Sequence, residues 1–446
     1  MRFSELDGAR VGVWGAGREI SSLAEQLARR LPSATLAVAA FDDLPSTDVR
    51  AVLQAPELRI VTAAEAVEAL SACDVVVRSP GVSMHRPELR ALRERGTPVT
   101  TATALWLAER EGRGVIGVTG TKGKSTTAAL IFHLASGAAG AAQLAGNIGV
   151  PALDLLEQPP TDLAVVELSS YQIADLAIGP QVALITNLFR EHADWHGSQE
   201  AYHEDKLRIA GLPGVRATVF NARDPRLSAA APEFAAAVPY GVPGGWQVTP
   251  RGIERAGELA LAAEELPLPG EHNALNLCGA LAALEAFGVS PPPLRPSLAS
   301  FDALPHRLQT VAERGGVLYV DDSISTTPES TIAALASFPD RPIVLIAGGQ
   351  DRGQDHAELA RVLAERAVAV IGVPTTGPRL LDAARAAGVP DSRAVGARDL
   401  EAALEAARSL AEDGGVILLS PAAPSYDSYR DFEERGERFG ALATAG

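Results

Sequence analysis

The chain has 446 residues, of which 47% are hydrophobic and 21% are charged, and its formal net charge is −16. This length predicts about three domains, and the composition is that of an ordinary packed protein. The acidic charge argues against a nucleic-acid partner, because it would repel a phosphate backbone.

The cysteines and the apolar segments indicate the compartment. Cys73 and Cys278 are the only cysteines, and they lie too far apart for a metal-type spacing, which fits a reducing cytosol. The first residues lack the apolar core of a signal peptide, and no uncharged apolar stretch approaches the roughly 18–20 residues of a membrane span. We therefore expect a cytoplasmic protein without membrane insertion.

Near the start of the chain, the sequence predicts a strand over Ala9–Trp14 and a helix from about Glu19 to Arg30. The turn between them, Gly15-Ala16-Gly17, resembles a nucleotide-binding turn but lacks the third glycine of the dinucleotide fingerprint. A nucleotide site and a plain strand-to-helix turn are both open interpretations. A second predicted strand, Asp74–Arg78, ends in Ser79-Pro80-Gly81.

The most informative segment is Gly-Val-Thr-Gly-Thr-Lys-Gly-Lys-Ser-Thr, residues 117–126. It follows an apolar run from Val115 and precedes a helical pattern, so a glycine-rich turn meets a helix N-terminus, where backbone N–H groups favour an anion. Lys124 can reach the outer phosphates of a nucleotide, and the Ser125 hydroxyl can ligate Mg²⁺. The first glycine lies one position earlier than in the standard P-loop. We expect the chain to bind a nucleoside triphosphate.

The middle of the chain alternates strands and helices, which predicts a parallel sheet buried on both faces. The predicted strands are Val115–Val118, Leu163–Glu167, Val182–Thr186 and Ala217–Asn221. Glu167 ends its strand, so it either holds Mg²⁺ beside the P-loop or caps the next segment.

Three further positions in this region have open interpretations. His192 lies just past a strand end and is either a metal ligand or a structural histidine. Lys206 follows Glu204 and Asp205, a pattern typical of a solvated helix face, and the residues alone give it no role. Asn273 and Asn276 lie three apart near the start of a predicted helix, where they could contact a base or cap the helix.

After a predicted linker over Leu294–Leu304, a second alternating region indicates another open α/β sheet. Its predicted strands are Gly316–Asp321, Pro342–Ala347, Ala367–Ile371 and Gly415–Leu419. Two loops that follow strands, Gly348–Arg352 and Ser420–Ser425, could form a small-ligand pocket.

Taken together, these motifs resemble the Mur ligase family over the whole chain, and most of all its glutamate-adding branch. The matching segments, in family order, are Thr119–Ser125, Gly146–Gly149, Glu167–Gln172, His192, Asp205–Arg208, His272–Asn276, Pro305-His306-Arg307, Asp322-Ser323 and Ser420-Pro421. Each match is modest alone, but their common order is specific.

The resemblance implies an α/β protein of three domains: an N-terminal Rossmann-like UDP-sugar domain (1–108), a central P-loop ATPase domain (109–303) and a C-terminal Rossmann-like amino-acid domain (304–446). It also implies an ATP-dependent ligase of peptidoglycan synthesis. ATP would phosphorylate the alanine carboxylate of UDP-N-acetylmuramoyl-L-alanine, and glutamate would attack the acyl phosphate. We expect Mg²⁺ as a cofactor and a monomer.

The resemblance also assigns roles by position. It assigns ATP binding to Gly120, Thr121, Lys122, Gly123, Lys124, Ser125, Thr126, Asn276, Arg307 and Asp322. It assigns UDP-sugar binding to Gly15, Ala16, Gly17, Arg18, Asn147 and Gln172. It assigns catalysis to Lys124, Glu167, His192 and Lys206, and the metal sites to Ser125, Glu167, His192 and Lys206. Lys206 resembles the family's carbamylated lysine.

The departures from the family lie at the amino-acid site, which the resemblance assigns to Thr326, Arg352, Ser425 and Phe432. The family lysine of this region is Ile324 here, and a second expected lysine is Arg352. Loss of a cation beside a dicarboxylate should matter, because hydrogen bonds to charged groups are stronger than neutral ones. The run from Ser323 resembles a variant branch that adds L-glutamate, so we expect L-glutamate to be favoured over D-glutamate.

Three alternatives stay open. One is the usual D-glutamate-adding enzyme. Another is a different ligase of the superfamily, such as a folylpolyglutamate synthase, which would lack the domain that contains Gly15-Ala16-Gly17. The third is a nucleotide-dependent switch, which would need neither a second strand-end pocket nor the pair His192 and Lys206.

Overall fold

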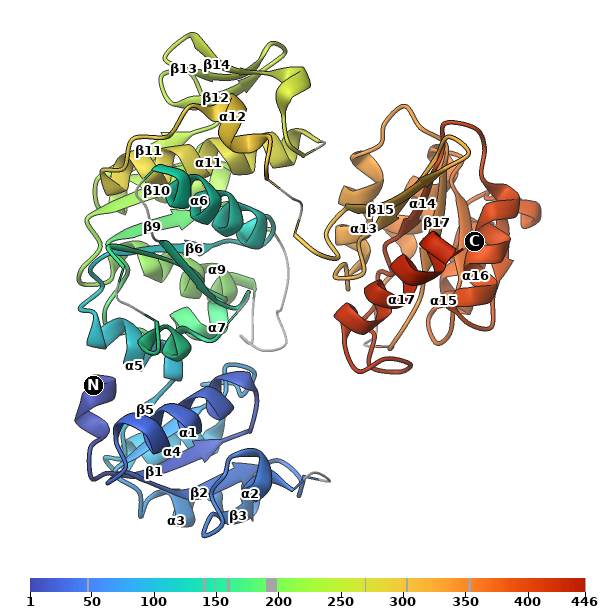
Figure 1. The fold of residues 1–446 in the computed structure, drawn as a ribbon. Coiled ribbons are helices and arrows are strands. Elements are labelled where there is room, and N and C mark those ends of the chain that lie inside the picture. The colour runs from blue at the N-terminus through green and yellow to red at the C-terminus, as the bar shows by residue number, and fades with distance from the viewer. Residues whose placement is uncertain are drawn as a thin grey trace. The chain divides into compact units, whose positions relative to one another are not determined.

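A computed structural model describes residues 1–45, 48–138, 142–148, 150–158, 161–189, 199–268, 270–301, 304–351 and 354–445. The chain forms two compact units (Figure 1). The first comprises Met1–Leu266 and His272–Phe301, and the second comprises Pro267–Glu271 and Asp302–Gly446. The predicted α/β class is confirmed, since each of the three large sheets is wholly or mainly parallel. The domain limits at 108/109 and 303/304 stay predictions.

The first sheet is parallel and has the order β3-β2-β1-β4-β5. Its strands are β1 (Arg10–Trp14), β2 (Thr35–Phe41), β3 (Arg59–Thr62), β4 (Val75–Arg78) and β5 (Val99–Thr100). Its helices are α1 (Arg18–Arg30), α2 (Val49–Val52), α3 (Ala63–Leu70), α4 (Pro87–Glu94) and α5 (Ala102–Glu109), and η1 (Phe3–Leu6) precedes them. The predictions of β1, α1 and β4 are confirmed to within one residue at each end.

The second sheet, also in the first unit, is parallel with the order β11-β10-β9-β6-β8-β7. Its strands are β6 (Val115–Thr119), β7 (Ala142–Gly146), β8 (Leu163–Glu167), β9 (Val182–Ile185), β10 (Ala217–Asn221) and β11 (Ala237–Tyr240). Its helical segments are α6 (Lys124–Ala138), η2 (Ala152–Leu156), α7 (Ser170–Ile173), α9 (Gln199–Leu207), η3 (Arg208–Gly211), α10 (Pro225–Ala230), η4 (Ala231–Glu233), α11 (Glu271–Phe287) and α12 (Leu294–Leu298).

A small antiparallel sheet, which the sequence analysis did not predict, lies in the same unit. It consists of β12 (Trp246–Thr249), β13 (Gly252–Arg255) and β14 (Glu258–Ala262), and η5 (Ala263–Glu265) follows it. The predicted linker over Leu294–Leu304 is partly wrong. Its first residues form α12, because Leu294 and Leu298 are buried in the core of the central sheet.

The third large sheet forms the second unit, in the order β15-β16-β20-β17-β18-β19, with only β15 antiparallel. Its strands are β15 (Gln309–Arg314), β16 (Val317–Asp321), β17 (Ile343–Ala347), β18 (Ala369–Gly372), β19 (Ala394–Gly396) and β20 (Val416–Leu419). Its helices are α13 (Pro328–Ala336), α14 (Ala357–Glu365), α15 (Gly377–Ala386), η6 (Asp391–Arg393), α16 (Leu400–Leu410) and α17 (Phe432–Ala445).

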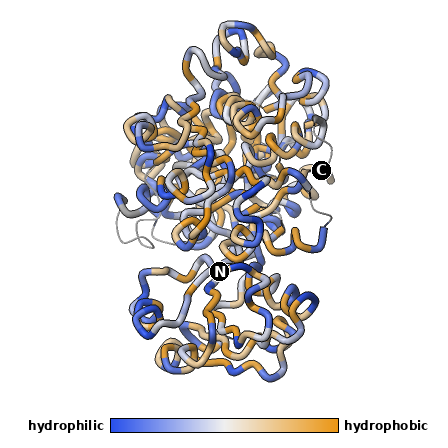
Figure 2. The backbone as a smooth tube through the Cα atoms, turned by 90° about the vertical axis from the view of Figure 1, so that its left-hand side faces the viewer, coloured by the Kyte–Doolittle hydropathy of each residue, from blue (hydrophilic) through white to orange (hydrophobic). Residues whose placement is uncertain are grey.

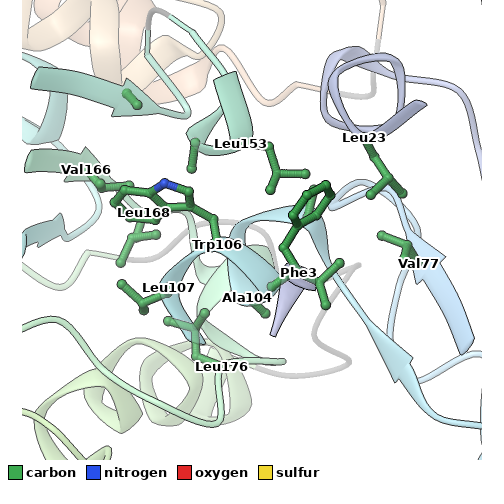
Figure 3. Packing of buried hydrophobic residues seen from close by; sticks show 14 of the residues in the cluster. Phe3, Leu23, Val77, Ala104, Trp106, Leu107, Leu153, Val166, Leu168 and Leu176 are labelled. Atoms are coloured by element: carbon green, nitrogen blue, oxygen red, sulfur yellow. The ribbon is translucent and has the colours of Figure 1, made fainter. Parts of the chain in front are cut away.

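One hydrophobic cluster joins the two parallel sheets of the first unit. Figure 3 shows members of it from both regions, among them Leu23 of α1, Trp106 of α5 and Leu168 after β8. Hydrophobic residues also gather inside each part of the chain in Figure 2, with hydrophilic residues at the rims. Among the described helices, none combines the length and apolar character needed to cross a membrane. The continuous cluster means that the first two sheets pack through a shared core.

Candidate nucleotide, substrate and amino-acid sites

The P-loop turn connects β6 to α6, and two of its glycines need the absence of a side chain. Gly120 has φ +138° and Gly123 has φ +81°, values that L residues rarely adopt. A Cβ atom on Gly120 would lie 2.0 Å from the Thr186 hydroxyl oxygen, and one on Gly123 would lie 2.3 Å from the Asn276 side-chain oxygen. The turn is therefore packed tightly between β9 and α11.

Two residues that directly follow β9 hold the P-loop backbone. The Asn187 side chain accepts a hydrogen bond from the Lys122 N–H at 2.8 Å and donates to the Lys122 carbonyl at 3.0 Å. The Thr186 hydroxyl donates to the same carbonyl at 2.6 Å. Lys124 Nζ donates to the Thr121 carbonyl at 2.8 Å. Neither Thr186 nor Asn187 was predicted to have a role, although a position directly after a strand is a signal for one.

Glu167 lies beside the P-loop because β6 and β8 are parallel neighbours, with Val118 opposite Glu167. The buried carboxylate accepts a hydrogen bond from the Ser125 hydroxyl at 2.6 Å and one from the Asn147 amide at 3.0 Å. A hydroxyl and a carboxylate are oxygen ligands that suit Mg²⁺, which usually takes its other ligands from phosphates and water. Within the described ranges, no group of three or more His, Cys, Asp or Glu residues could hold a metal ion.

Lys206 does not lie on a solvated helix face, so that prediction from its acidic neighbours is wrong. Its side chain in α9 is 2% exposed, and its Nζ lies 4.8 Å from the centre of the Tyr202 ring. The Tyr202 hydroxyl is in turn hydrogen-bonded to the Thr121 hydroxyl of the P-loop at 3.1 Å. Lys206 is thus buried next to a tyrosine that is hydrogen-bonded to the P-loop. His192 lies outside the described residues.

Asn276 is buried in α11 and contacts the P-loop at Gly123. Its side-chain amide donates to the Asn273 side-chain oxygen at 3.3 Å. The helix begins at Glu271, five residues earlier, so the alternative in which Asn276 caps the helix is wrong. The remaining predicted P-loop contacts, Thr121 to Thr126, all lie in the turn or the first turn of α6.

The glycine turn that follows β1 contains three of the predicted UDP-sugar residues, and the fourth, Arg18, begins α1. Gly15 has φ +87°, and α1 begins at Arg18 with Gly17 as its N-cap. The other two predicted residues are Asn147 and Gln172. Asn147 is exposed and its amide donates a hydrogen bond to Glu167, whereas Gln172 is 2% exposed. The Gln172 amide donates to the Glu19 carboxylate of α1 at 2.5 Å, so Gln172 lies where α7 meets the first domain. Burial raises the pKa of Glu19.

In the second unit, the turn around Arg307 is held by two consecutive aspartates at the end of β16. His306 has φ +62° and Leu308 has φ +47°, so both neighbours of Arg307 are in the strained left-handed region. The His306 ring nitrogen Nδ1 lies 2.7 Å from the Asp321 carboxylate, and the Leu308 N–H donates to Asp322 at 3.3 Å. These contacts fix the backbone on both sides of Arg307.

Asp322 is almost fully buried, and burial raises its pKa to about 6. The Ser420 hydroxyl donates to its carboxylate at 2.7 Å, and Ser420 follows β20. The two loops predicted to form a pocket are in direct contact, because the Gly348 N–H donates to the Pro421 carbonyl at 2.9 Å and the Gln350 N–H donates to the Pro424 carbonyl at 2.8 Å. Arg307 and Asp322 belong to the second unit, whereas the P-loop and Asn276 belong to the first.

Arg435 of α17 connects three loops at the predicted amino-acid site, and the sequence analysis did not identify it. The guanidinium is 3% exposed, and burial lowers its pKa to about 10. It donates to the Ser323 hydroxyl at 2.9 Å and to the carbonyls of Ser323 and Ala423 at 2.8 and 3.2 Å. Its Nη1 also lies 3.5 Å from the Gly348 carbonyl, beside a cavity of about 230 Å³.

The described residues that were predicted to bind the amino-acid substrate lie in three places: after β16, after β20 and at the start of α17. Thr326 and Ile324 are half-buried after β16, Ser425 is buried after β20, and Phe432 is the first residue of α17. The Ser323 hydroxyl donates to the Phe432 carbonyl at 2.8 Å, which joins two of these segments. Arg352 lies outside the described residues.

Comparisons with known proteins place the chain in a family. Residues 118–284 match the Mur ligase middle domain, and residues 306–423 match the Mur ligase glutamate ligase domain. A UDP-N-acetylmuramoyl-L-alanine–L-glutamate ligase of Xanthomonas axonopodis pv. citri is 42% identical, over 99% of this chain and 97% of the relative. A Micromonospora ligase of the same name is 44% identical, over 98% of this chain and 97% of the relative. The structure of UDP-N-acetylmuramate–alanine ligase MurC from Thermotoga maritima aligns with a TM-score of 0.63 at 20% identity, covering 98% and 99%.

We predict that Gly123→Ala reduces the affinity for ADP by at least about tenfold. A left-handed alanine costs about 1–3 kcal/mol, and its Cβ would displace the buried Asn276 amide. Calorimetric titration with ADP and Mg²⁺ measures the change. Gly137→Ala in α6 is the matched control, because nothing lies within 4 Å of its Cβ position. Equal ADP affinities for the two variants would contradict the packing described here.

We predict that Asp322 lowers stability as the pH rises. The pKa of Asp322 is about 6 in the folded chain and 3.8 in the unfolded chain. Its contribution to the free energy of unfolding is therefore complete below pH 3.8 and is lost as the pH rises through 6. Between pH 5 and 7.5 the loss should be about 1–2 kcal/mol. Urea unfolding of the ligand-free chain at both pH values should show a smaller decline for Asp322→Asn than for the wild type. The exposed Asp340→Asn serves as control, and a decline in Asp322→Asn equal to that of the wild type would refute the prediction.

Proposed function

This chain belongs to the Mur ligase family, and we propose that it joins L-glutamate to the alanine carboxylate of UDP-N-acetylmuramoyl-L-alanine. It is an ATP-dependent ligase that forms an amide bond in peptidoglycan synthesis. The observation that carries the proposal is the 42% identity to an L-glutamate ligase across 99% of the chain. ATP, the UDP-sugar and glutamate are its proposed partners, and a cytoplasmic monomer is its proposed form.

The proposed reaction activates a carboxylate, which is a poor electrophile. A carboxylate oxygen of the alanine attacks the γ-phosphorus of ATP, and ADP leaves. The glutamate nitrogen then attacks the acyl carbon, loses a proton, and the tetrahedral intermediate expels phosphate as the amide forms. Several anions must approach one another in these steps, so cations and preorganised N–H donors have the largest effect on the rate.

In this scheme Lys124 neutralises charge on the transferring phosphoryl group, while the P-loop N–H groups of residues 120–126 hold the ATP phosphates. Ser125 and Glu167, whose side chains are 2.6 Å apart, would hold Mg²⁺. Bound Mg²⁺ neutralises phosphate charge and orients the phosphates. His192 and a carbamylated Lys206 are proposed to complete the metal sites. The buried position of Lys206 beside Tyr202 supports a role other than a surface charge.

The preference for L-glutamate rests on Ile324. A lysine at this position would place a cation after β16, next to Thr326 and near the loops joined by Arg435, whereas isoleucine leaves that position apolar. If the glutamate amine stays at the acyl phosphate, inversion of the α-carbon moves one carboxylate of glutamate to a different position. A lysine at position 324 would then no longer pair with that carboxylate. Arg352 can bind a carboxylate through two parallel hydrogen bonds.

A D-glutamate-adding enzyme is the alternative, because Ser425 and Phe432 still match the glutamate residues of that branch. A folylpolyglutamate synthase fits less well. The chain has a complete five-stranded domain before the P-loop, and the L-glutamate ligases align with nearly all of it.

We predict that L-glutamate is incorporated at least as well as D-glutamate when both are present at equal concentration. The expected cause is the altered cation pattern at Ile324 and Arg352. Product from a competition assay, separated by chiral analysis after hydrolysis, measures the ratio. Ile324→Lys should shift this ratio toward D-glutamate, with Ile324→Met as the control of similar volume but no charge. A strong preference for D-glutamate that Ile324→Lys leaves unchanged would defeat the proposal.

We predict that Lys206→Ala abolishes ligation and that short carboxylic acids partly restore it. A small carboxylate would occupy the space of the lost side chain and supply the anion that a carbamate provides. The rate of phosphate release with all three substrates, with and without added formate or acetate, measures the rescue. The wild type should gain nothing from these acids. Turnover of the variant close to that of the wild type would exclude Lys206 from the mechanism.

A further inference from the structure

Arg78, the last residue of β4, is a fully buried cation where the first domain meets the central sheet. Its exposed fraction is 0%, and its partner Asp175 follows α7 in the central region, with Nε and the carboxylate 2.5 Å apart. A buried ion pair gives little net stability against apolar residues of the same volume, but removal of one partner leaves an uncompensated buried charge. This one connects segments that are 97 residues apart in the chain.

One side of the guanidinium shapes the loop after β4. Nη1 lies 3.3, 3.0 and 2.7 Å from the carbonyl oxygens of Ser79, Pro80 and Val82. Three carbonyls therefore converge on one nitrogen, which closes residues 79–82 into a compact turn. A mobile loop could not hold these carbonyls together without a buried donor.

That turn packs against the glycine turn that contains the predicted UDP-sugar residues. A Cβ atom on Gly15 would lie 3.0 Å from Ser79 Cβ, and one on Gly17 would lie 3.0 Å from Ser79 Oγ. The Ser79 N–H also donates to the carbonyl of Trp14 at 2.8 Å. The position of Ser79 therefore sets the position of the backbone from Trp14 to Gly17.

The other side of the guanidinium reaches α7, which begins three residues after Glu167. Nη2 donates to the Tyr171 carbonyl at 2.7 Å, and Nε donates to Asp175. The next residue, Gln172, donates to Glu19 of α1 at 2.5 Å. The same short helix is thus bonded to the glycine-turn region from two directions, through Arg78 and through Glu19.

We propose that Arg78 is a positioning residue for the UDP-sugar: it fixes the glycine turn 15–17 at one distance from α7 and from the phosphate-transfer residues that precede α7. The proposal rests on the proposed function, because it presumes that this turn binds the UDP-sugar. Only a guanidinium suits the position. It donates in several fixed directions at once, whereas a lysine offers one compact charge on a flexible stem.

The test compares Arg78→Lys with the wild type in the full chain. We expect the KM for UDP-N-acetylmuramoyl-L-alanine to rise about tenfold or more, because small misplacements of a binding turn have large effects. The KM for ATP and for glutamate should stay within about twofold. Calorimetric titration of the same variant with UDP-N-acetylmuramoyl-L-alanine and, separately, with ADP shows whether the loss is confined to the sugar nucleotide.

Arg29→Met is the matched control. Arg29 of α1 pairs with Glu157, which follows η2, so it crosses the same junction, but its side chain is 57% exposed. We expect no change in any KM for this variant. If Arg78→Lys does not fold, Asp175→Asn replaces it under the same criteria, because it weakens the pair while Arg78 keeps its loop carbonyls.

The outcomes separate the two proposals. A wild type that neither binds nor ligates UDP-N-acetylmuramoyl-L-alanine contradicts the proposed function. A wild type that does, with a variant whose KM for the sugar nucleotide is unchanged, overturns the role of Arg78. An equal loss for all three substrates also overturns it, because that pattern belongs to a purely structural residue.

Discussion

The proposed chemistry of this chain depends on the parallel pairing of β6 with β8, which sets Val118 opposite Glu167. Because the carboxyl ends of neighbouring parallel strands meet at one edge, the P-loop and the acid reach the same point from segments about 40 residues apart. The Ser125 hydroxyl then donates to the Glu167 carboxylate, and so does the amide of Asn147, which directly follows β7. A slip of one residue would turn the Glu167 side chain to the other face of the sheet.

Buried charged groups extend this arrangement to the other sites. Arg78 joins the loop after β4 to α7, and Arg435 joins loops after β16, β17 and β20. Asp322 does the same for Ser420 and the turn that contains Arg307. In each case one buried side chain bonds groups from different segments of the chain. Each predicted substrate site therefore contains or adjoins a buried charged residue that joins separate segments.

Much of this was predictable from the sequence. The P-loop is a contiguous motif, and the position of Glu167 follows from the rule that ligands bind at strand ends. Burial of Lys206 was not predictable, because two acidic neighbours indicate a solvated face and only the packing of α9 shows otherwise. The contacts of Arg78 and Arg435 also could not be predicted from the sequence. Each arginine makes a contact with a residue more than 90 positions away, and an arginine that will be buried looks in sequence like any surface charge.

We propose that ATP cleavage is coupled to amide formation between the two other substrates. Release of inorganic phosphate from ATP, followed continuously, tests it most directly when the UDP-sugar and glutamate are omitted in turn. We predict negligible release with ATP alone and sustained release only when UDP-N-acetylmuramoyl-L-alanine and glutamate are both present, with one amide formed per phosphate. Robust hydrolysis of ATP alone, unchanged by the UDP-sugar, would contradict the account and indicate a nucleotide-dependent switch.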